Sequence, residues 1–441
     1  MKRLLPLLLC AVLALFCATT AQAAGVSITL TASEYALHYA FDAGAQDPFV
    51  ILEYATPAEK GWMMLYSEDG HFEGDVSLAY SGAGGKTSVA LTSARTTGSI
   101  GKASTTLPKA ADYQKPTGKS NAKVMDFVLT ETPEGFHYAF NAAGTDYMLL
   151  YWRSKEQTVT QPVYPDENGH YEGDVISNLT FARTQFTVQV KSGSGSMKKE
   201  ATVRKGYQAP EAPQRQEGRL SGVTVCIDAG HQENGRFVNE PIGPGLTGST
   251  SGKGGMAQGT KTNRRESIVC LEIGMLLRDE LLRQGANVVM TREDQTTFHT
   301  NIERCEIAEA GGAQIMLRLH CNNSSNRSKR GIQVYGPLNS DYAKAVADAD
   351  TYREMGQKLL DAMKTRVGMT LANSTGMVRL NDNYVGNNWA KMMCFLVEMG
   401  YLSNPAEEYL LVTPVYQQWL AEGMADGVYE IAVARGWVQA Q

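Results

Sequence analysis

The sequence contains little cysteine and no excess of positive charge. Seven cysteines occur in 441 residues, and Cys10 and Cys17 lie in an apolar N-terminal stretch. The other five are an odd number and form no C-x-x-C pair, which argues against a cysteine-ligated zinc site and leaves disulfide pairing open. The formal net charge is -5, and an acidic chain is a poor candidate for neutralising phosphates. We therefore expect no nucleic-acid partner.

Long hydrophobic runs are missing beyond the N-terminus. Lys2 and Arg3 precede the apolar stretch Leu4–Cys17, which is shorter than the roughly 20 residues of a membrane-spanning helix. A small-x-small cleavage site follows at Ala21-Gln22-Ala23. These features predict a secretory signal peptide over residues 1–23. The mature chain is then expected to be exported to the cell wall or periplasm, without stable membrane insertion.

Two motifs of other enzyme classes are absent or incomplete. No G-x-S-x-G elbow occurs, which argues against a serine hydrolase. Gly252-Lys253 resembles part of a phosphate-binding loop, but no Ser or Thr follows Lys253, and Thr247 stands where the first Gly should be. Nothing in the sequence therefore supports a nucleotide-binding or serine-dependent activity.

The first half of the chain contains an internal repeat. His38-Tyr39-Ala40-Phe41 recurs as His137-Tyr138-Ala139-Phe140, and Gly70–Val76 recurs in closely similar form as Gly169–Val175. Both recurrences have the same offset, which indicates a tandem duplication. Alternating apolar and polar residues, punctuated by Gly, Asp and Asn, predict antiparallel strands. We expect two small β-sandwich modules of the immunoglobulin-like kind at residues 24–112 and 113–207.

Four of the seven histidines lie at matched positions of the repeat. They are His38, His71, His137 and His170. One interpretation is that they occupy strand or turn positions inherited through duplication, because histidine is commonly half-buried. The other is that they contact a ligand or metal in each module. The modules could bind wall polymers or serve as spacers, and the sequence does not choose between these roles.

The second half changes in character after a polar, proline-containing linker at residues 208–219. Strands are predicted at residues 223–227, 286–290, 314–319, 331–335 and 392–397, and helices at residues 267–283, 300–310 and 343–366. This alternation is typical of an α/β fold. We expect residues 220–441 to form one domain with a mostly parallel sheet and helices on both faces.

Four polar residues lie at the edges of these predicted elements. His231, His320 and Glu398 each follow a strand, and Glu266 opens the first helix. Because the carboxyl ends of parallel strands meet at one edge of a sheet, we expect these side chains to share a pocket. Two histidines and a carboxylate can hold zinc with one position open, and a further carboxylate can act on water there. Each residue alone is more often structural, and their convergence favours a hydrolase.

Four sequence segments carry a resemblance to a known family. Ile227–His231, Arg265–Ser267, Arg318–Asn322 and Val397–Pro405 resemble the zinc-dependent N-acetylmuramoyl-L-alanine amidases, which are cell-wall hydrolases of the third amidase class. The resemblance extends over about residues 222–433. The chain departs from the family by having Ala229 where Pro is usual. It also has a longer Gly/Ser-rich stretch, Glu233–Asn263, that could cover the site.

The resemblance implies roles for these residues. His231, Glu266 and His320 would bind one Zn²⁺, and Glu398 would be the catalytic carboxylate. The substrate would be peptidoglycan, cut at the amide between the lactyl group of N-acetylmuramic acid and L-alanine.

Three neighbouring residues have less specific expectations. Asp228 is expected to support the zinc ligands, and Arg318 and Asn322 to contact substrate, with a purely structural role as the alternative for each. Two other functions stay open. The chain could be another zinc hydrolase or peptidase that acts on peptidoglycan peptides, or a non-catalytic wall-binding protein that kept the fold.

Overall fold

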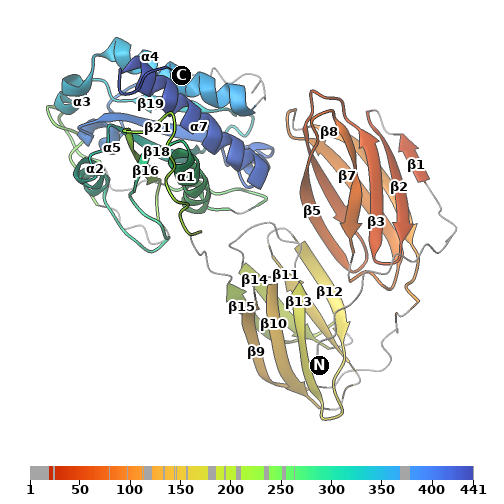
Figure 1. Ribbon diagram of the computed structural model, residues 1–441. Helices are drawn as coiled ribbons and strands as arrows, with labels where there is room; N and C mark the ends of the chain where they lie inside the picture. Colours follow the sequence, from red (N-terminus) through yellow and green to blue (C-terminus); the bar gives the residue numbers. More distant parts are fainter. Residues whose placement is uncertain are drawn as a thin grey trace.

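Two β-modules precede an α/β domain along the chain, as the computed structural model in Figure 1 shows. The structure describes residues 19–440, apart from residues 23–24, 79, 97, 112, 114–121, 133–134, 144, 146, 155–156, 177–184, 193–194, 205–209, 233–237, 251–254, 263 and 368–377. Among the helices of this described part, none is both long and apolar enough to cross a membrane.

The predicted signal peptide lies largely outside the described residues. Of residues 1–23, only Thr19–Gln22 are described, as strand β1. This strand pairs antiparallel with β2 (Ser27–Ser33) at the edge of a sheet. Cleavage after Ala23 would remove β1, and the signal peptide stays a prediction.

The first module packs two antiparallel sheets face to face. One sheet has the order β1-β2-β3-β6, and the other contains the run β5-β4-β7-β8. The new strands are β3 (Ala36–Asp42), β4 (Phe49–Ala55), β5 (Glu59–Tyr66), β6 (His71–Ser77), β7 (Gly85–Ser93) and β8 (Ser99–Leu107). Alternate residues such as Leu37, Tyr39 and Phe41 of β3 point inward and are buried. This period of two is what the alternating sequence predicts.

The second module repeats this arrangement. Its sheets contain the runs β13-β10-β9 and β15-β14-β11-β12. The strands are β9 (Val124–Thr132), β10 (Gly135–Ala142), β11 (Met148–Arg153), β12 (Gln157–Val163), β13 (His170–Ile176), β14 (Gln185–Lys191) and β15 (Met197–Arg204). His38 pairs with Asp75 across β3 and β6, and His137 pairs with Asp174 across β10 and β13. The strand register is therefore the same in both copies.

The two modules share one sheet. β12 of the second module pairs antiparallel with β5 of the first, so their larger sheets join into eight strands. Tyr80 of the first module meets the buried Trp152 of the second edge to face, with ring centroids 5.8 Å apart. This joint was not predicted, because the pattern within each strand carries no information about which edge strands will pair.

The α/β domain is built on a six-stranded sheet with the order β17-β16-β18-β21-β19-β20. The pairs β16–β17, β16–β18, β18–β21 and β19–β20 are parallel, and β19–β21 is antiparallel. The strands are β16 (Thr224–Ala229), β17 (Asn287–Met290), β18 (Ile315–Asn322), β19 (Gln333–Gly336), β20 (Val378–Leu380) and β21 (Met393–Tyr401).

Helices cover both faces of this sheet, which explains the nearly continuous apolar runs of its strands. The helices are α1 (Glu266–Arg283), α2 (Asn301–Ala310), α3 (Asp341–Val346), α4 (Ala349–Val367), α5 (Val385–Trp389), α6 (Glu407–Leu410) and α7 (Pro414–Ala434). Val225 and Ile227 of β16 lie in the core with α1 and α7, whereas Cys226 between them lies with residues of α2. Successive residues of one strand therefore fill two separate cores.

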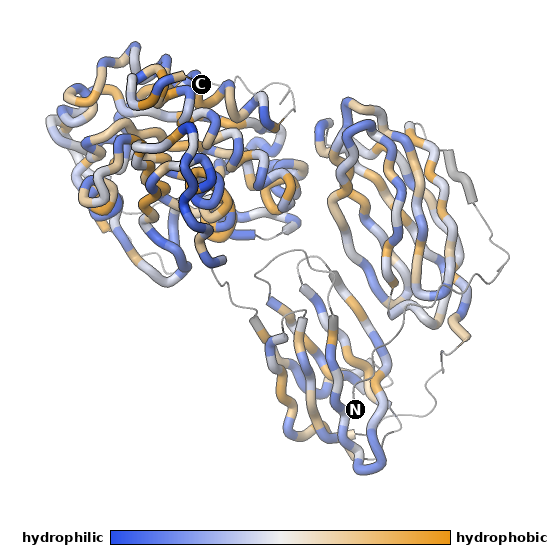
Figure 2. Tube along the Cα trace, viewed as in Figure 1, coloured by the Kyte–Doolittle hydropathy of each residue, from blue (hydrophilic) through white to orange (hydrophobic). Residues whose placement is uncertain are grey.

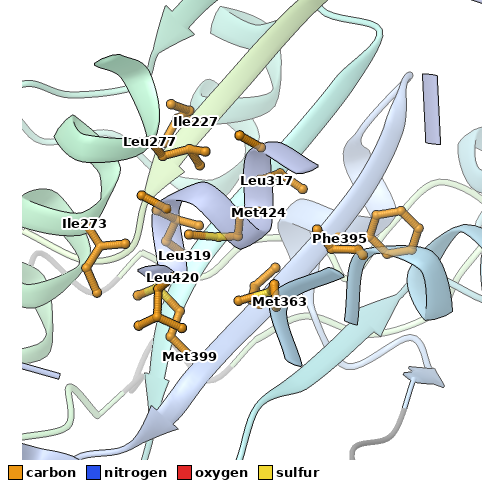
Figure 3. Close-up of a cluster of buried hydrophobic side chains, with 14 of the residues drawn as sticks. Ile227, Ile273, Leu277, Leu317, Leu319, Met363, Phe395, Met399, Leu420 and Met424 are labelled. Carbon is orange, nitrogen blue, oxygen red and sulfur yellow. The ribbon is translucent and has the colours of Figure 1, made fainter. Parts of the chain in front are cut away.

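The larger core lies between the sheet and the helices α1, α4 and α7. Figure 3 shows Leu317 and Leu319 of β18 gathered with Ile273 of α1 and Leu420 and Met424 of α7. Figure 2 shows how apolar and polar segments alternate along the chain of this domain. Leu319 is fully buried, so its truncation to Ala should cost roughly 2–5 kcal/mol.

Three predicted boundaries were wrong. The strands predicted to stop before His320 and Glu398 continue to Asn322 and Tyr401, because backbone pairing persists after the apolar pattern ends. The helix predicted over residues 343–366 is two helices, α3 and α4, since Ala347 has an extended backbone. The Asp348 side chain accepts a hydrogen bond from the Thr351 N–H and thereby restarts the helix.

The first module packs against the α/β domain through aromatic side chains. Phe49 lies against Trp419 of α7 with ring centroids 5.3 Å apart, and Trp62 lies against Tyr409 of α6 at 4.5 Å. Phe49 is 1% exposed and belongs to the core of the α/β domain. The predicted linker is also partly docked, since Arg278 of α1 donates a hydrogen bond to the Pro210 carbonyl.

Candidate metal and active site

Three of the predicted site residues lie together at one edge of the parallel strands. His231 follows β16, His320 lies near the end of β18, and Glu266 begins α1. One ligand atom from each lies within 4.8 Å of the others. His231 Nε2 is 3.2 Å from Glu266 Oε2, and His320 Nδ1 is 2.9 Å from Glu266 Oε1. Separate segments thus place two imidazoles and a carboxylate around one point.

The ionisation of this cluster suits a cation. Burial raises the pKa of Glu266, but hydrogen bonds with His231 and His320 outweigh it and hold that pKa below its ordinary value. Burial lowers the pKa of His320, opposed in part by Glu266. A metal requires an ionised carboxylate and a neutral imidazole. His320 Nε2 is buried and has no hydrogen-bond partner among the described residues, so the site offers a donor atom that the protein itself does not use.

Glu398 lies in the same cleft but outside the three-residue cluster. It occupies the position on β21 that pairs with His320 on β18. Burial raises the pKa of Glu398 well above its ordinary value, and the Glu266 carboxylate raises it further. Its Oε2 atom is buried and has no hydrogen-bond partner among the described residues. The cleft, of about 870 Å³, is lined by all four predicted residues.

The turn that carries His231 has an unusual backbone. His231 has φ +58°, the left-handed region that non-glycine residues seldom adopt. Just before it, a Cβ on Gly230 would lie 2.4 Å from the Leu319 carbonyl oxygen and 2.7 Å from His320 Cε1. Only glycine therefore allows this turn to lie against β18. The strained His231 persists because surrounding contacts hold it.

Those contacts come from a buried charge network around Asp228. Its Oδ1 atom accepts from Arg304, and its Oδ2 atom accepts from Arg318 Nε at 2.8 Å. Burial raises the pKa of Asp228, but the two guanidinium groups outweigh it and hold that pKa far below its ordinary value. Arg304 also donates to the carbonyls of Ala229 and His231. The network therefore positions the turn that presents His231.

Both residues expected to contact substrate line the cleft, but their side chains have different partners. Arg318 is 3% exposed, and its guanidinium is bound by Asp228 and by Asn301 Oδ1, which favours the structural alternative for this residue. Asn322 lines the cleft, and its side-chain amide donates to Gln333 Oε1 at 3.2 Å. Whether Asn322 touches substrate stays a prediction.

Several supporting residues were given no site role from the sequence. Arg292 donates to the carbonyls of Ala229, Gly230 and Ser267, and so joins the His231 turn to α1. Glu240 accepts from the backbone N–H groups of Asn301 and Ile302 at the start of α2. The role of Arg292 has little local sequence signal, because these three carbonyl partners lie 25 to 63 residues away along the chain.

The Gly/Ser-rich stretch forms part of the cleft wall. Among its described residues, Val238, Glu240, Ile242 and Thr250 line the cleft. The segment is fastened beside the site, since Asn388 donates to the Ile242 carbonyl and Trp389 donates to the Pro241 carbonyl. His299 lines the same cleft and is not part of the three-residue cluster.

The donor set fits zinc. Two imidazoles and one carboxylate are a ligand set that zinc accepts in open catalytic sites, and the unpartnered His320 Nε2 is the kind of buried atom that such a metal would satisfy. The backbone N–H groups of Ala257 and Cys321 donate to Glu266 at 2.8 and 3.0 Å and orient its carboxylate. Hydrogen bonds of this kind commonly hold metal ligands in place.

Comparison with known proteins agrees with the resemblance. The profile of the N-acetylmuramoyl-L-alanine amidase family, Amidase_3, matches residues 225–430. The germination-specific N-acetylmuramoyl-L-alanine amidase of Bacillus subtilis is 26% identical over 231 residues, which cover 49% of this chain and 83% of that protein. The probable cell wall amidase LytH of Staphylococcus aureus is 27% identical over 218 residues, which cover 48% of this chain and 60% of LytH.

Among solved structures, the apo form of the N-acetylmuramyl-L-alanine amidase Ami1 from Mycobacterium abscessus is similar to this chain. It is 21% identical, with 48% of this chain and 99% of that chain covered, at a TM-score of 0.44. The family profile spans β16 through most of α7 and includes all four predicted site residues. Residues 225–430 of this chain form an amidase domain of the N-acetylmuramoyl-L-alanine amidase family.

Proposed function

We propose that this protein is an exported, zinc-dependent amidase of peptidoglycan. It hydrolyses the amide between the lactyl group of N-acetylmuramic acid and L-alanine of the stem peptide. The observation that carries the proposal is the convergence of His231, Glu266 and His320 within 4.8 Å, beside Glu398 in one cleft. The family profile over these residues supports the choice of bond.

The proposed chemistry divides the work among these side chains. His231, Glu266 and His320 would hold a zinc ion, which would supply Lewis acidity to activate water and polarise the amide carbonyl. Glu398 accepts a proton from the attacking water and returns it to the leaving amino group of L-alanine. Its position opposite His320 and its raised pKa suit a group that exchanges protons with water and the leaving amine.

Mass spectrometry of digested cell walls tests this function. The purified protein should release stem peptides with a free L-alanine amino terminus and leave a free lactyl carboxylate on the glycan. Cleavage between residues of the stem peptide would favour the alternative zinc peptidase. Binding to walls without any released product would favour the non-catalytic alternative. The Glu398→Ala variant, treated identically, serves as the inactive control.

We also propose the organisation of the whole chain. Residues 1–23 direct export, residues 24–112 and 113–207 are duplicated immunoglobulin-like modules, residues 208–219 link them to the enzyme, and residues 220–441 are the catalytic domain. The equal registers of β3–β6 and β10–β13 support the duplication. The modules are proposed to bind wall polymers, which a pull-down of residues 24–207 on walls with and without secondary polymers would test.

A further inference from the structure

The turn between Ala257 and Glu266 is tied at its base to a proposed zinc ligand. The Glu266 N–H donates to the Ala257 carbonyl at 2.9 Å, and the Ala257 N–H donates to Glu266 Oε2 at 2.8 Å. Between them, Gly259 donates to the Arg264 carbonyl, also at 2.9 Å. The position of Ala257 therefore determines both the backbone and the carboxylate of Glu266.

The tip of the same turn is held by Glu408 of α6. Glu408 Oε2 accepts from the Lys261 and Thr262 N–H groups at 2.8 and 3.1 Å, and Oε1 accepts from Thr260 Oγ1 at 3.0 Å. A Cβ on Gly259 would lie 2.6 Å from Glu408 Oε2, so the carboxylate lies directly against the turn. Four hydrogen bonds, counting a longer one from Thr262 Oγ1, converge on one side chain.

The setting of Glu408 makes these bonds strong and costly to lose. The residue is 0% exposed. Bonds to a carboxylate are roughly twice as strong as neutral ones, and a buried acceptor that loses its donors costs about 1–3 kcal/mol or more. The described tip of the turn, residues 260–262, contains no helix or strand. Its backbone N–H groups therefore lack the partners of regular secondary structure, and the Glu408 carboxylate accepts from two of them instead.

We propose that Glu408 is a positioning residue for zinc binding. It holds the tip of the turn at residues 260–262, and the turn places the Ala257 N–H where it orients Glu266 toward His231 and His320. Glu408 touches neither the metal nor the substrate. The inference rests on the proposed role of Glu266 as a zinc ligand. Residues that orient metal ligands typically change metal affinity 10–100-fold when mutated.

A matched pair of variants separates this role from general stability. Glu408→Gln keeps the volume but faces the two N–H donors with a group that also donates. Glu407→Gln removes the charge of the neighbouring glutamate, which is equally buried and accepts from the Gly331 and Tyr401 N–H groups instead. Thr260→Val, which removes one donor to Glu408, is a milder variant that preserves the fold if Glu408→Gln does not.

Zinc affinity of the full chain, measured by competition with a chromogenic chelator, is the first readout. Zinc should bind about 10–100-fold more weakly to Glu408→Gln, severalfold more weakly to Thr260→Val, and within about threefold of the unsubstituted value to Glu407→Gln. Hydrogen exchange of the zinc-free proteins is the second readout. The amides of Lys261 and Thr262 should exchange faster in Glu408→Gln and not in Glu407→Gln.

Unchanged zinc affinity in Glu408→Gln, or equal weakening in Glu407→Gln, would overturn this inference while leaving the zinc site intact. Failure of the unsubstituted protein to bind zinc at all would overturn the proposed function and this inference together. The two failures are therefore distinguishable in one set of titrations.

Discussion

Among the described residues, histidine is grouped with carboxylates in two kinds of place, and only the cleft of the α/β domain has the character of a metal site. In the α/β domain, His231, Glu266 and His320 lie in a cleft, and His320 Nε2 has no hydrogen-bond partner among the described residues. In the first β-module, His38 is engaged at both ring nitrogens. Its Nδ1 is 3.1 Å from Asp75 and its Nε2 is 3.3 Å from Glu73.

The second module repeats the exposed arrangement. His137 Nδ1 is 2.9 Å from Asp174, and its Nε2 is 3.1 Å from Glu172. The carboxylates of these pairs are more than half exposed, and exposed ion pairs typically contribute about 0–1 kcal/mol. Residue type and spacing therefore do not distinguish a metal site from a cross-strand ion pair. Burial of the residues and a donor atom without a partner in the protein do distinguish the two.

The largest effect on activity should come from replacing Glu398, which lies in the cleft of the α/β domain. Glu398→Ala removes the proposed proton acceptor, so hydrolysis of cell walls should fall by about 10²–10⁴-fold. Zinc content should stay at the unsubstituted level, because Glu398 is not in the ligand cluster. Release of stem peptides measures the first quantity, and elemental analysis measures the second. Full activity in this variant would remove Glu398 from the mechanism.

Replacing Asp by Asn should lower the free energy of unfolding more in the buried network of the α/β domain than in the exposed ion pairs of a β-module. Asp228→Asn leaves two buried guanidinium groups without their carboxylate, which should destabilise the domain by about 3–5 kcal/mol. Asp75→Asn removes an exposed partner of His38 and should cost at most about 1 kcal/mol. Urea denaturation followed by circular dichroism gives both values. Equal costs would contradict the distinction between the two settings.

The pH dependence of the free energy of unfolding should come mainly from Glu407, whose side chain is buried. Burial raises the pKa of Glu407 to about 7, opposed by the Tyr401 and Gly331 N–H groups. Because the folded pKa lies above the unfolded one, its contribution is complete below about pH 4.5 and is lost as the pH rises through about 7, on the order of 3 kcal/mol. Glu407→Gln should flatten the decline in Tm between pH 5 and 8. An unchanged profile would show that Glu407 ionises normally.

The exposed histidines should have the smallest effect. The Asp42 side chain raises the pKa of His71, against a smaller opposing effect of desolvation, so its contribution is present at acidic pH and lost as the pH rises through the folded pKa. Since the ring is exposed and its carboxylate partners are solvated, His71→Gln should leave the Tm profile almost unchanged between pH 5 and 8. A change in the Tm profile as large as that of Glu407→Gln would mean that the ion pairs of the module histidines contribute substantially to stability.

The sequence could predict that the four candidate residues would meet in one cleft, because each lies beside a recognisable element. Val223–Ile227 reads as a buried strand, and His231 follows it within one turn. The helix predicted at residues 300–310 also formed, and Thr300 and Glu303 make a capping box at its start. The supporting network was not predictable in this way. Asp228, Arg304 and Arg318 come from three elements, and only the folded sheet brings their charges together.

Element boundaries were less predictable than element types. His320 and Glu398 interrupt an apolar pattern while the backbone pairing of β18 and β21 continues past them. The joint between β5 and β12 depends on which edge strands meet, and no periodicity encodes that. The carboxylate partners of the module histidines lie on the neighbouring strand in register, so the spacing along the chain did not reveal them.

Zinc stoichiometry is the most direct test of whether the metal binds in the cleft of the α/β domain. The full chain, its His231→Ala variant and its His38→Ala/His137→Ala double variant should each be dialysed against trace zinc and analysed for bound metal. The account predicts about one zinc per chain in the unsubstituted protein and in the double variant, and none in His231→Ala. Retention of zinc by His231→Ala together with its loss from the double variant would place the metal in the β-modules and contradict the account.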